Sequence, residues 1–294
     1  QLYPVTLPEG ITADKALAAP DEIVTLTVTA PAAYTVAVTY IPAGGSPVPI
    51  PEADGVYTFA MPAAPVTVGA DFSLTWAGLQ TLLNAGGTVR LLCDVTADVD
   101  SSFLKVPAGV TVTLDLNGHT VDRALTEAVS SGNVLQIYGS LTLGDSSAGG
   151  TGLITGGYST GDGGGVCAFG TFIMEGGTIS GNSANRGGGV YVGVNQTFTM
   201  SGGTITGNTA SNGGGVYVNG TFNLSGGTIT SNTASNNGGG VVVSGTFTMT
   251  GGTITSNTAS NYGGGVNVSG NATFTMEDGT IIGNSTTYYG GGVY

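Results

Sequence analysis

Side chains suited to acid–base chemistry gather in one short stretch of the chain: Asp115, His119, Asp122 and Arg123. Three more aspartates precede them, at Asp94, Asp98 and Asp100. Carboxylates that flank a glycosidic bond, or that combine with calcium and a basic residue, are groups that cleave polysaccharides. A single histidine between a strand and a turn is more often a structural hydrogen-bonding group. The stretch is therefore kept as an alternative enzymatic site, with a structural role favoured.

A second candidate site is a column of side chains between paired valines, one in each repeat: Tyr191, Tyr217, Val242 and Asn267. Strand alternation directs this column outward. Aromatic rings on a flat sheet stack on sugar rings, so Tyr191, Tyr217 and Asn267 are candidate glycan-binding residues. The simpler interpretation, that the tyrosines stack on one another across repeats, is favoured.

Outward threonine pairs form a third pattern: Thr204 and Thr206, Thr228 and Thr230, Thr253 and Thr255. The pattern resembles the ice-binding face of β-helical antifreeze proteins. Threonine is also an ordinary solvent-facing strand residue, so ice binding is only a remote alternative.

The charge composition limits the classes of partner that this chain can bind. The formal net charge is −13, only 8% of the residues are charged, and 15 of the 18 acids lie at or before Asp162. Nucleic acid and anionic membranes both require a basic surface, so neither is expected as a partner. No apolar run reaches the length of a membrane span.

The Gly-Asp-Gly-Gly-Gly run at 161–165 lacks the second aspartate of a calcium-binding nonapeptide, and neither a metal nor a cofactor is expected. Cys93 and Cys167 are expected to be free thiols.

The elements that carry these residues come from a repeat. Gly-Gly-Gly-Val recurs with its valine at positions 166, 190, 216, 241, 266 and 293, in steps of 24, 26, 25, 25 and 27 residues. Such a period is typical of a solenoid or a propeller. Because each period holds three short strands between glycine-rich corners, we expect an all-β, right-handed three-sheet parallel β-helix with about 25 residues per coil. The regular repeats cover 163–294.

Alternation within one coil predicts its interior: Val190, Val192, Phe198, Met200, Ile205 and Ala210. The asparagines that follow the third strand are expected to form a ladder along the axis: Asn182, Asn208, Asn232, Asn257 and Asn284. The glycine triplets permit positive φ and close stacking of successive turns.

The remaining segments complete the domain plan. Residues 1–72 contain several short strand patterns and predict a small all-β domain. Residues 73–294 form the β-helix domain, with a short amphipathic helix near 75–85 that covers the first coil. The array stops within a repeat at Tyr294 without a polar cap, so the natural chain is expected to continue.

Two resemblances refine this plan. The run Tyr57-Thr58-Phe59-Ala60-Met61-Pro62, followed by Val66 to Phe72, resembles the end of internalin-type B-repeat domains, which are spacers on Gram-positive surface proteins. The run from Thr113 to Thr120, with the GGGV and GGTIxxN series, resembles right-handed parallel β-helix proteins of the bacterial surface, and the repeats are similar in style to those of polymorphic outer-membrane proteins. Here Ile-x-x-Asn replaces the phenylalanine motif of that family, and no autotransporter barrel follows. The resemblance implies a fold, a surface location and an adhesive or scaffolding role.

The expected function is that of a secreted or cell-surface, monomeric, adhesin-like protein. It would bind an extended ligand, such as a glycan or a host surface, along the faces of the β-helix. A polysaccharide lyase or glycosidase using the stretch around Asp115 is one alternative, although the balance is against an enzyme. A passive surface spacer is another.

Overall fold

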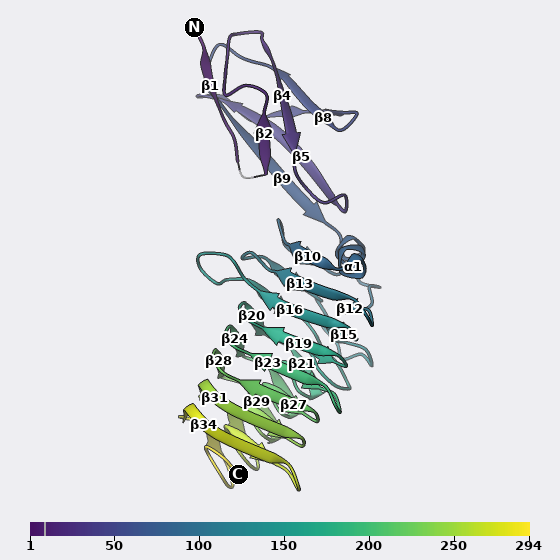
Figure 1. Ribbon diagram of the computed structural model, residues 1–294, viewed down its shortest axis with the longest axis vertical. Coiled ribbons are helices and arrows are strands. Elements are labelled where there is room, and N and C mark those ends of the chain that lie inside the picture. Colours follow the sequence, from purple (N-terminus) through teal and green to yellow (C-terminus); the bar gives the residue numbers. More distant parts are fainter. Residues whose placement is uncertain (9) are drawn as a thin grey trace. The chain divides into compact units, whose positions relative to one another are not determined.

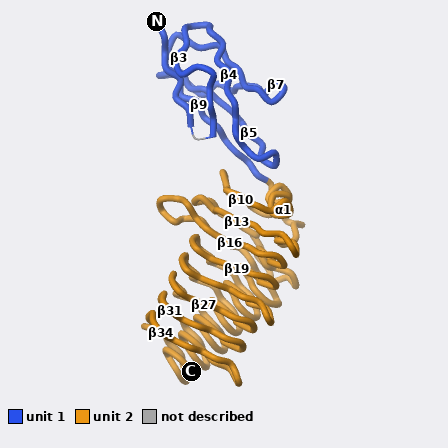
Figure 2. Tube along the Cα trace, viewed as in Figure 1, with its two compact units in different colours: residues 1–74 blue, residues 75–294 orange. Residues whose placement is uncertain are grey.

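The computed structural model describes residues 1–8 and 10–294. The chain divides into two compact units, Gln1–Leu74 and Thr75–Tyr294 (Figure 2). The division falls two residues after the boundary expected at residue 72.

The first unit is a pair of β-sheets. Five strands pair in the order β3-β1-β9-β5-β6 and four in the order β2-β4-β8-β7. The strands are β1 Tyr3–Thr6, β2 Ile11–Ala13, β3 Leu17–Ala18, β4 Ile23–Val28, β5 Tyr34–Pro42, β6 Val48–Ile50, β7 Glu52–Ala53, β8 Val56–Ala60 and β9 Val66–Leu74. The short strand patterns expected in residues 1–72 are present as strands of these two sheets.

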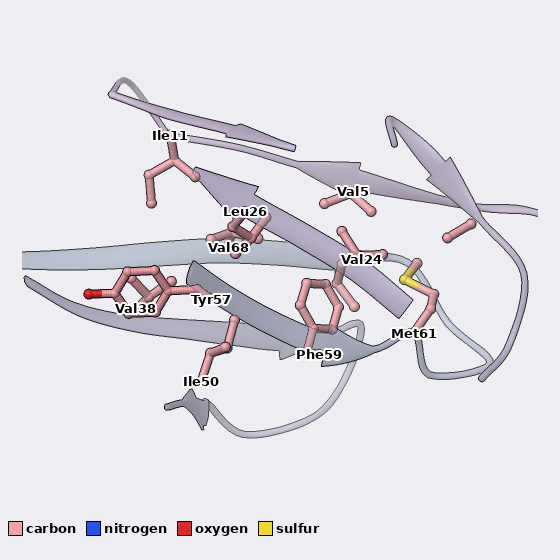
Figure 3. Close-up of a cluster of buried hydrophobic side chains, with 12 residues drawn as sticks. Val5, Ile11, Val24, Leu26, Val38, Ile50, Tyr57, Phe59, Met61 and Val68 are labelled. Carbon is pink, nitrogen blue, oxygen red and sulfur yellow. The ribbon is translucent and has the colours of Figure 1, made fainter. Parts of the chain in front are cut away.

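Apolar side chains from these strands gather into one core (Figure 3). Leu26, Phe59 and Met61 are almost fully buried in it, and Phe59 stacks on Tyr40 with ring centroids 4.6 Å apart. This small unit therefore has its own hydrophobic core.

The second unit begins with the helix α1, Trp76–Ala85. The hydroxyl of Thr75 accepts a hydrogen bond from the Gly78 N–H and caps its start, whereas Gly86, at φ 76°, ends it. Trp76, Leu79 and Leu83 are buried. Among the described residues, no helix has the length and apolar character needed to cross a membrane.

After α1 the chain winds into coils whose strands all pair in parallel (Figure 1). A regular coil contains four strands, not the three expected, as in β22 Val190–Val192, β23 Thr197–Met200, β24 Thr204–Thr206 and β25 Thr209–Asn212. The fourth strand has two to five residues and directly follows the ladder asparagine, so in the sequence it looks like a polar corner. Sheets nevertheless number three in this unit, because β31 Thr246–Thr255 and β34 Thr273–Ile282 each run through the second and third strand positions.

The first-position strands form the seven-stranded sheet: β12 Leu104–Val106, β15 Leu135–Ile137, β18 Val166–Ala168, β22, β26 Val216–Val218, β30 Val241–Val243 and β33 Val266–Val268. The 14-stranded sheet adds to β23, β24, β31 and β34 the strands β10 Gly87–Arg90, β11 Val95–Thr96, β13 Thr111–Asp115, β14 Thr120–Asp122, β16 Ser140–Gly144, β17 Leu153–Thr155, β19 Thr171–Met174, β20 Thr178–Ser180, β27 Thr221–Leu224 and β28 Thr228–Thr230. The five-stranded sheet holds β21 Ser183–Arg186, β25, β29 Thr233–Asn237, β32 Thr258–Ala259 and β35 Ser285–Thr286.

The interior of the coils is as the alternation predicts. Five of the six interior side chains predicted for one coil are fully buried, and the sixth, Ala210, is 3% exposed. Phe172, Phe198, Phe222 and Phe247 stack in register along the axis, with centroids 4.7 to 4.8 Å apart. That spacing equals the distance between hydrogen-bonded strands, so the core repeats with the backbone.

The asparagine ladder is also confirmed. The amide of Asn208 donates to Oδ1 of Asn232 at 3.0 Å, and that oxygen also accepts the Asn208 backbone N–H. The same amide donates to the Ile179 carbonyl of the preceding coil. Because each amide joins its neighbours in both directions, its burial leaves no polar group unsatisfied.

Glycine triplets make the close stacking possible. A Cβ at Gly214 would lie 2.6 Å from the carbonyl oxygens of both Gly239 and Thr233. The first glycine of that triplet, Gly213, has φ 66°. The triplet is thus needed both for its turn and for contact between coils. Cys167 is a buried thiol that forms no disulfide.

Candidate functional site

A stripe of aromatic rings runs along the outer side of the seven-stranded sheet. We call it the aromatic stripe and define it as Tyr138, Phe169, Tyr191 and Tyr217. Successive ring centroids are 5.5, 6.4 and 5.9 Å apart. Tyr138 is 44% exposed and Phe169 is 41% exposed, whereas Tyr191 is 6% exposed. The stripe therefore has an open end and a covered end.

Strand register places these rings. Ile137 pairs with Ala168, and Cys167 pairs with Tyr191. Tyr138 and Phe169 each directly follow a first-position strand, while Tyr191 and Tyr217 occupy the middle of theirs. The stripe thus shifts by two positions between the coil of Phe169 and the next. Its rings remain in contact because neighbouring coils are only one strand spacing apart.

The middle position of these strands is not the open surface expected from alternation. Tyr191 and Asn267 are buried, at 6% and 5% exposed, and Tyr217 is only partly exposed. Alternation predicts the outward direction of this position but not its exposure, and at Tyr191 other side chains fold over the ring. The Asn219 amide donates to the Tyr191 hydroxyl at 2.7 Å, and Phe169 and Tyr217 flank its ring.

The Arg186 side chain also covers the rings of Tyr191 and Tyr217. Its guanidinium carbon lies 5.3 Å from the Tyr191 ring centroid and 5.4 Å from that of Tyr217. Nε and Nη2 hold the two carboxylate oxygens of Asp162 at 2.7 and 2.8 Å. This hydrogen-bonded pairing raises the pKa of Arg186. Burial raises the pKa of the Tyr191 phenol, so the covered end stays uncharged at the rings.

Sequence reasoning missed the open end of the stripe. The sequence analysis singled out neither Tyr138 nor Phe169. The same position in the following coils holds Gly193, Asn219 and Ser244, so a search for a repeating residue passes over it. The sequence did contain a signal for these two rings. Each directly follows a three-residue strand whose first and third side chains point inward, Leu135–Ile137 before Tyr138 and Val166–Ala168 before Phe169.

The side chains of the alternative enzymatic site are engaged in separate structural hydrogen bonds. Asp115 accepts the backbone N–H groups of Asn117 and Ser146, and its second oxygen accepts the Ser146 hydroxyl. Burial acts to raise its pKa, but these bonds and Arg90 outweigh it and the pKa lies below the usual value. The carboxylate is thus fixed in its ionised form by a turn.

The other members of that stretch have separate contacts. His119 Nδ1 lies 3.3 Å from Oδ1 of Asp94, an oxygen that also accepts the Thr120 N–H. Asp122 accepts the N–H of Ala124 in its own turn. Arg123 is directed inward and is 5% exposed. Within residues 1–8 and 10–294, no three His, Cys, Asp or Glu side chains are grouped as a metal site.

Comparison with known proteins bears on the fold. Residues 146–294, just over half of the chain, match the family described as the right-handed β-helix region. The chain belongs to the right-handed β-helix family. Neither curated proteins nor solved structures gave a match. Membership in the β-helix family fits adhesin-like or polysaccharide-active proteins in general, and no named relative narrows it further.

The β-helix also aligns the outward threonines. Thr178, Thr204, Thr228 and Thr253 pair in register, and Thr206, Thr230 and Thr255 form the neighbouring column. The two columns are partly exposed. Parallel pairing alone produces this alignment from any repeated residue, so it supplies an ordered hydroxyl surface and no catalytic group.

Proposed function

We propose that this protein is a secreted or cell-surface bacterial adhesin-like protein that binds an extended glycan along the outside of its β-helix. The observation that carries the proposal is the aromatic stripe. Its exposed rings, Tyr138 and Phe169, lie on consecutive coils, and exposed aromatic surface of this kind favours a binding role.

The spacing of the stripe supports an extended saccharide as the ligand. Coils follow one another at about 4.8 Å, which is close to the length of one sugar ring. Aromatic rings on two consecutive coils can therefore contact consecutive sugars of a chain lying along the axis. The ion pair of Arg186 with Asp162 leaves little net charge beside the rings, which favours a neutral glycan.

The candidate glycan-binding residues from the sequence, Tyr191, Tyr217 and Asn267, have other roles in this proposal. Tyr191 and Tyr217 support the stripe from its covered end, and the exposed rings make the contact. Asn267 lies three coils beyond Tyr191, and its amide oxygen accepts a hydrogen bond from the Ser269 hydroxyl. We do not include it in the contact surface.

The test is a glycan-array screen of the full chain, followed by titration calorimetry on any glycan retained. The Tyr138→Ala, Phe169→Ala double variant is expected to lose roughly tenfold or more in affinity, because two central aromatic contacts are removed. Tyr158→Ala is the matched control, since Tyr158 is 39% exposed and lies outside the stripe. Its binding should not change.

Two outcomes would contradict the proposal. Equal losses in the double variant and in Tyr158→Ala would place the contact elsewhere. Absence of glycan binding by the unmodified chain would leave a passive surface spacer as the better reading.

A further inference from the structure

Arg123 is a buried cation with no counter-ion among the described residues. Of its nitrogens, Nη2 has a hydrogen-bond partner, the Ser101 carbonyl oxygen. Nε and Nη1 are buried and have none within the described residues. No ion pair joins Arg123 to a carboxylate in that part of the chain. Arg186, by contrast, is paired through two nitrogens with Asp162.

The local fold forces this side chain inward. Oδ1 of Asp122 accepts the Ala124 N–H, and Ala124 has φ 52°, so the chain reverses sharply at Arg123. The guanidinium lies 5.9 Å from the centroid of the Trp76 ring. Trp76 is itself fixed, because its Nε1 donates to the Ser102 carbonyl at 2.7 Å. The charge is therefore held in place from two sides.

Leaving such a charge unpaired costs free energy. An arginine stays protonated in proteins, and an unpaired buried ion is strongly unfavourable. Burial lowers the pKa of Arg123, because removal from water disfavours the charged form of the guanidinium. An anion that reached the guanidinium would relieve it.

A pocket of about 340 Å³ borders this residue. Its walls include Ala97, Val99, Leu125 and Val129, and Asp98 and Glu127 also line it. An aliphatic chain of a few carbons fits such walls. In the neighbouring segment 98–101 the Asp98 N–H donates to the Ser101 hydroxyl, the Ser101 N–H donates to the Asp98 carbonyl, and Val99 is 97% exposed. Arg123 itself lines the pocket, and because its Nη1 is buried, an anion reaches that atom only if this segment moves.

We propose that this pocket binds a small aliphatic carboxylate, with the carboxylate paired to Arg123 and the aliphatic part against the apolar walls. Nη1 and the second N–H of Nη2 form the two-pronged edge that matches a carboxylate. This site shares no residue with the aromatic stripe. Its outcome is therefore independent of the proposed glycan binding.

The experiment is titration calorimetry and thermal unfolding of the full chain with acetate, butanoate and 4-methylpentanoate. The neutral amide of the last acid is the matched ligand control. Affinity is expected to rise along the acid series as the apolar walls are covered, and bound acid should raise the Tm. The amide should not bind. Equal binding of acid and amide, or no binding by any of the three acids, would overturn the proposal.

Variants locate the site. Arg123→Lys keeps the charge but loses the two-pronged edge, and a roughly tenfold loss of affinity is expected. Ala97→Trp fills the pocket without touching the charge and should abolish binding, which keeps the test decisive if Arg123→Lys does not fold. Lys105→Gln removes an exposed cation from β12 and should leave binding unchanged. Unchanged binding in both pocket variants would also refute the site.

Discussion

The corners of the coils are stabilised differently in two regions of the solenoid. These regions are the early coils, residues 87–160, and the regular coils, residues 163–294. Both must satisfy backbone and turn groups at the corners of a parallel solenoid. In the regular coils a repeated asparagine and a repeated glycine triplet do so. In the early coils single carboxylates do so, as Asp115 and Asp145 show. Charge therefore gathers where the repeat is least regular, and a cluster of acids there is weak support for catalysis.

The largest expected effect comes from the glycine triplets. Gly214→Ala would place a Cβ 2.6 Å from two carbonyl oxygens, so we expect a loss of about 4 kcal/mol or more in unfolding free energy. Gly144→Ala, at the end of the early strand β16, has open space around its Cβ and should change stability little. Urea unfolding of both variants measures the contrast. Similar losses in the two would remove the distinction between the regions.

The asparagine ladder ranks next. Asn232→Ala would leave the Asn208 amide and backbone N–H without their acceptor, and the Ile205 carbonyl without its donor. We expect a loss of roughly 3 kcal/mol by urea unfolding. Asn236→Ala, an exposed position of the same coil, should cost less than about 0.5 kcal/mol. A tolerant Asn232 would show that the ladder is not a main source of stability.

The early coils should respond to acid. Burial acts to raise the pKa of Asp145, but the N–H groups of Gly152, Ser147 and Gly118 outweigh it and the pKa is lowered. Because the folded pKa lies below the unfolded one, this stabilisation is complete above the unfolded pKa, near 4, and is lost as pH falls through the folded value. Asp145→Asn should cost roughly 2 kcal/mol at pH 7, and the gap from wild type should narrow at pH 3.

Chemical unfolding of Asp145→Asn at pH 7 and pH 3 checks this expectation. Asp100→Asn, at an exposed position, serves as the control and should follow wild type at both values. A gap that stayed constant with pH would mean that the carboxylate's charge is not what holds the turn.

The smallest effect is expected on the threonine face. Thr206→Val with Thr230→Val keeps the branched strand shape and removes two partly exposed hydroxyls, so stability should stay within about 0.5 kcal/mol. Thermal hysteresis measured beside it tests the remote ice-binding alternative. Hysteresis in wild type that the double variant lost would support that alternative.

Predictions of side-chain position from the sequence were most accurate where one residue type recurs at the same position of every coil. The interior valines, phenylalanines and isoleucines and the asparagine ladder follow from periodicity, because parallel coils place each repeat above the last. The fourth strand of each coil was missed because Thr209 to Asn212 looks like a polar turn. At Tyr191 strand alternation gives the outward direction but not the exposure, because it cannot show that Arg186 covers that side.

The candidate site was only partly predictable for the same reason. Tyr191 and Tyr217 repeat and were found, while Tyr138 and Phe169 occur in coils of unequal length and were not. Asp122 and Arg123 are adjacent in sequence but one accepts a hydrogen bond within its turn while the other is directed inward. Such a separation depends on the turn geometry at Ala124, which no residue pattern specifies.

The asparagine ladder has a further consequence for the length of the molecule. Each amide bonds only within its own coil and to the adjoining coils, so removal of one whole period would bring two equivalent asparagines together in the same geometry. Phenylalanine and glycine columns would rejoin in the same way. Duplication or loss of one period within the regular coils would therefore preserve the contacts of these three columns. The number of coils can change one at a time while the ladder, the phenylalanine stack and the glycine corners stay the same.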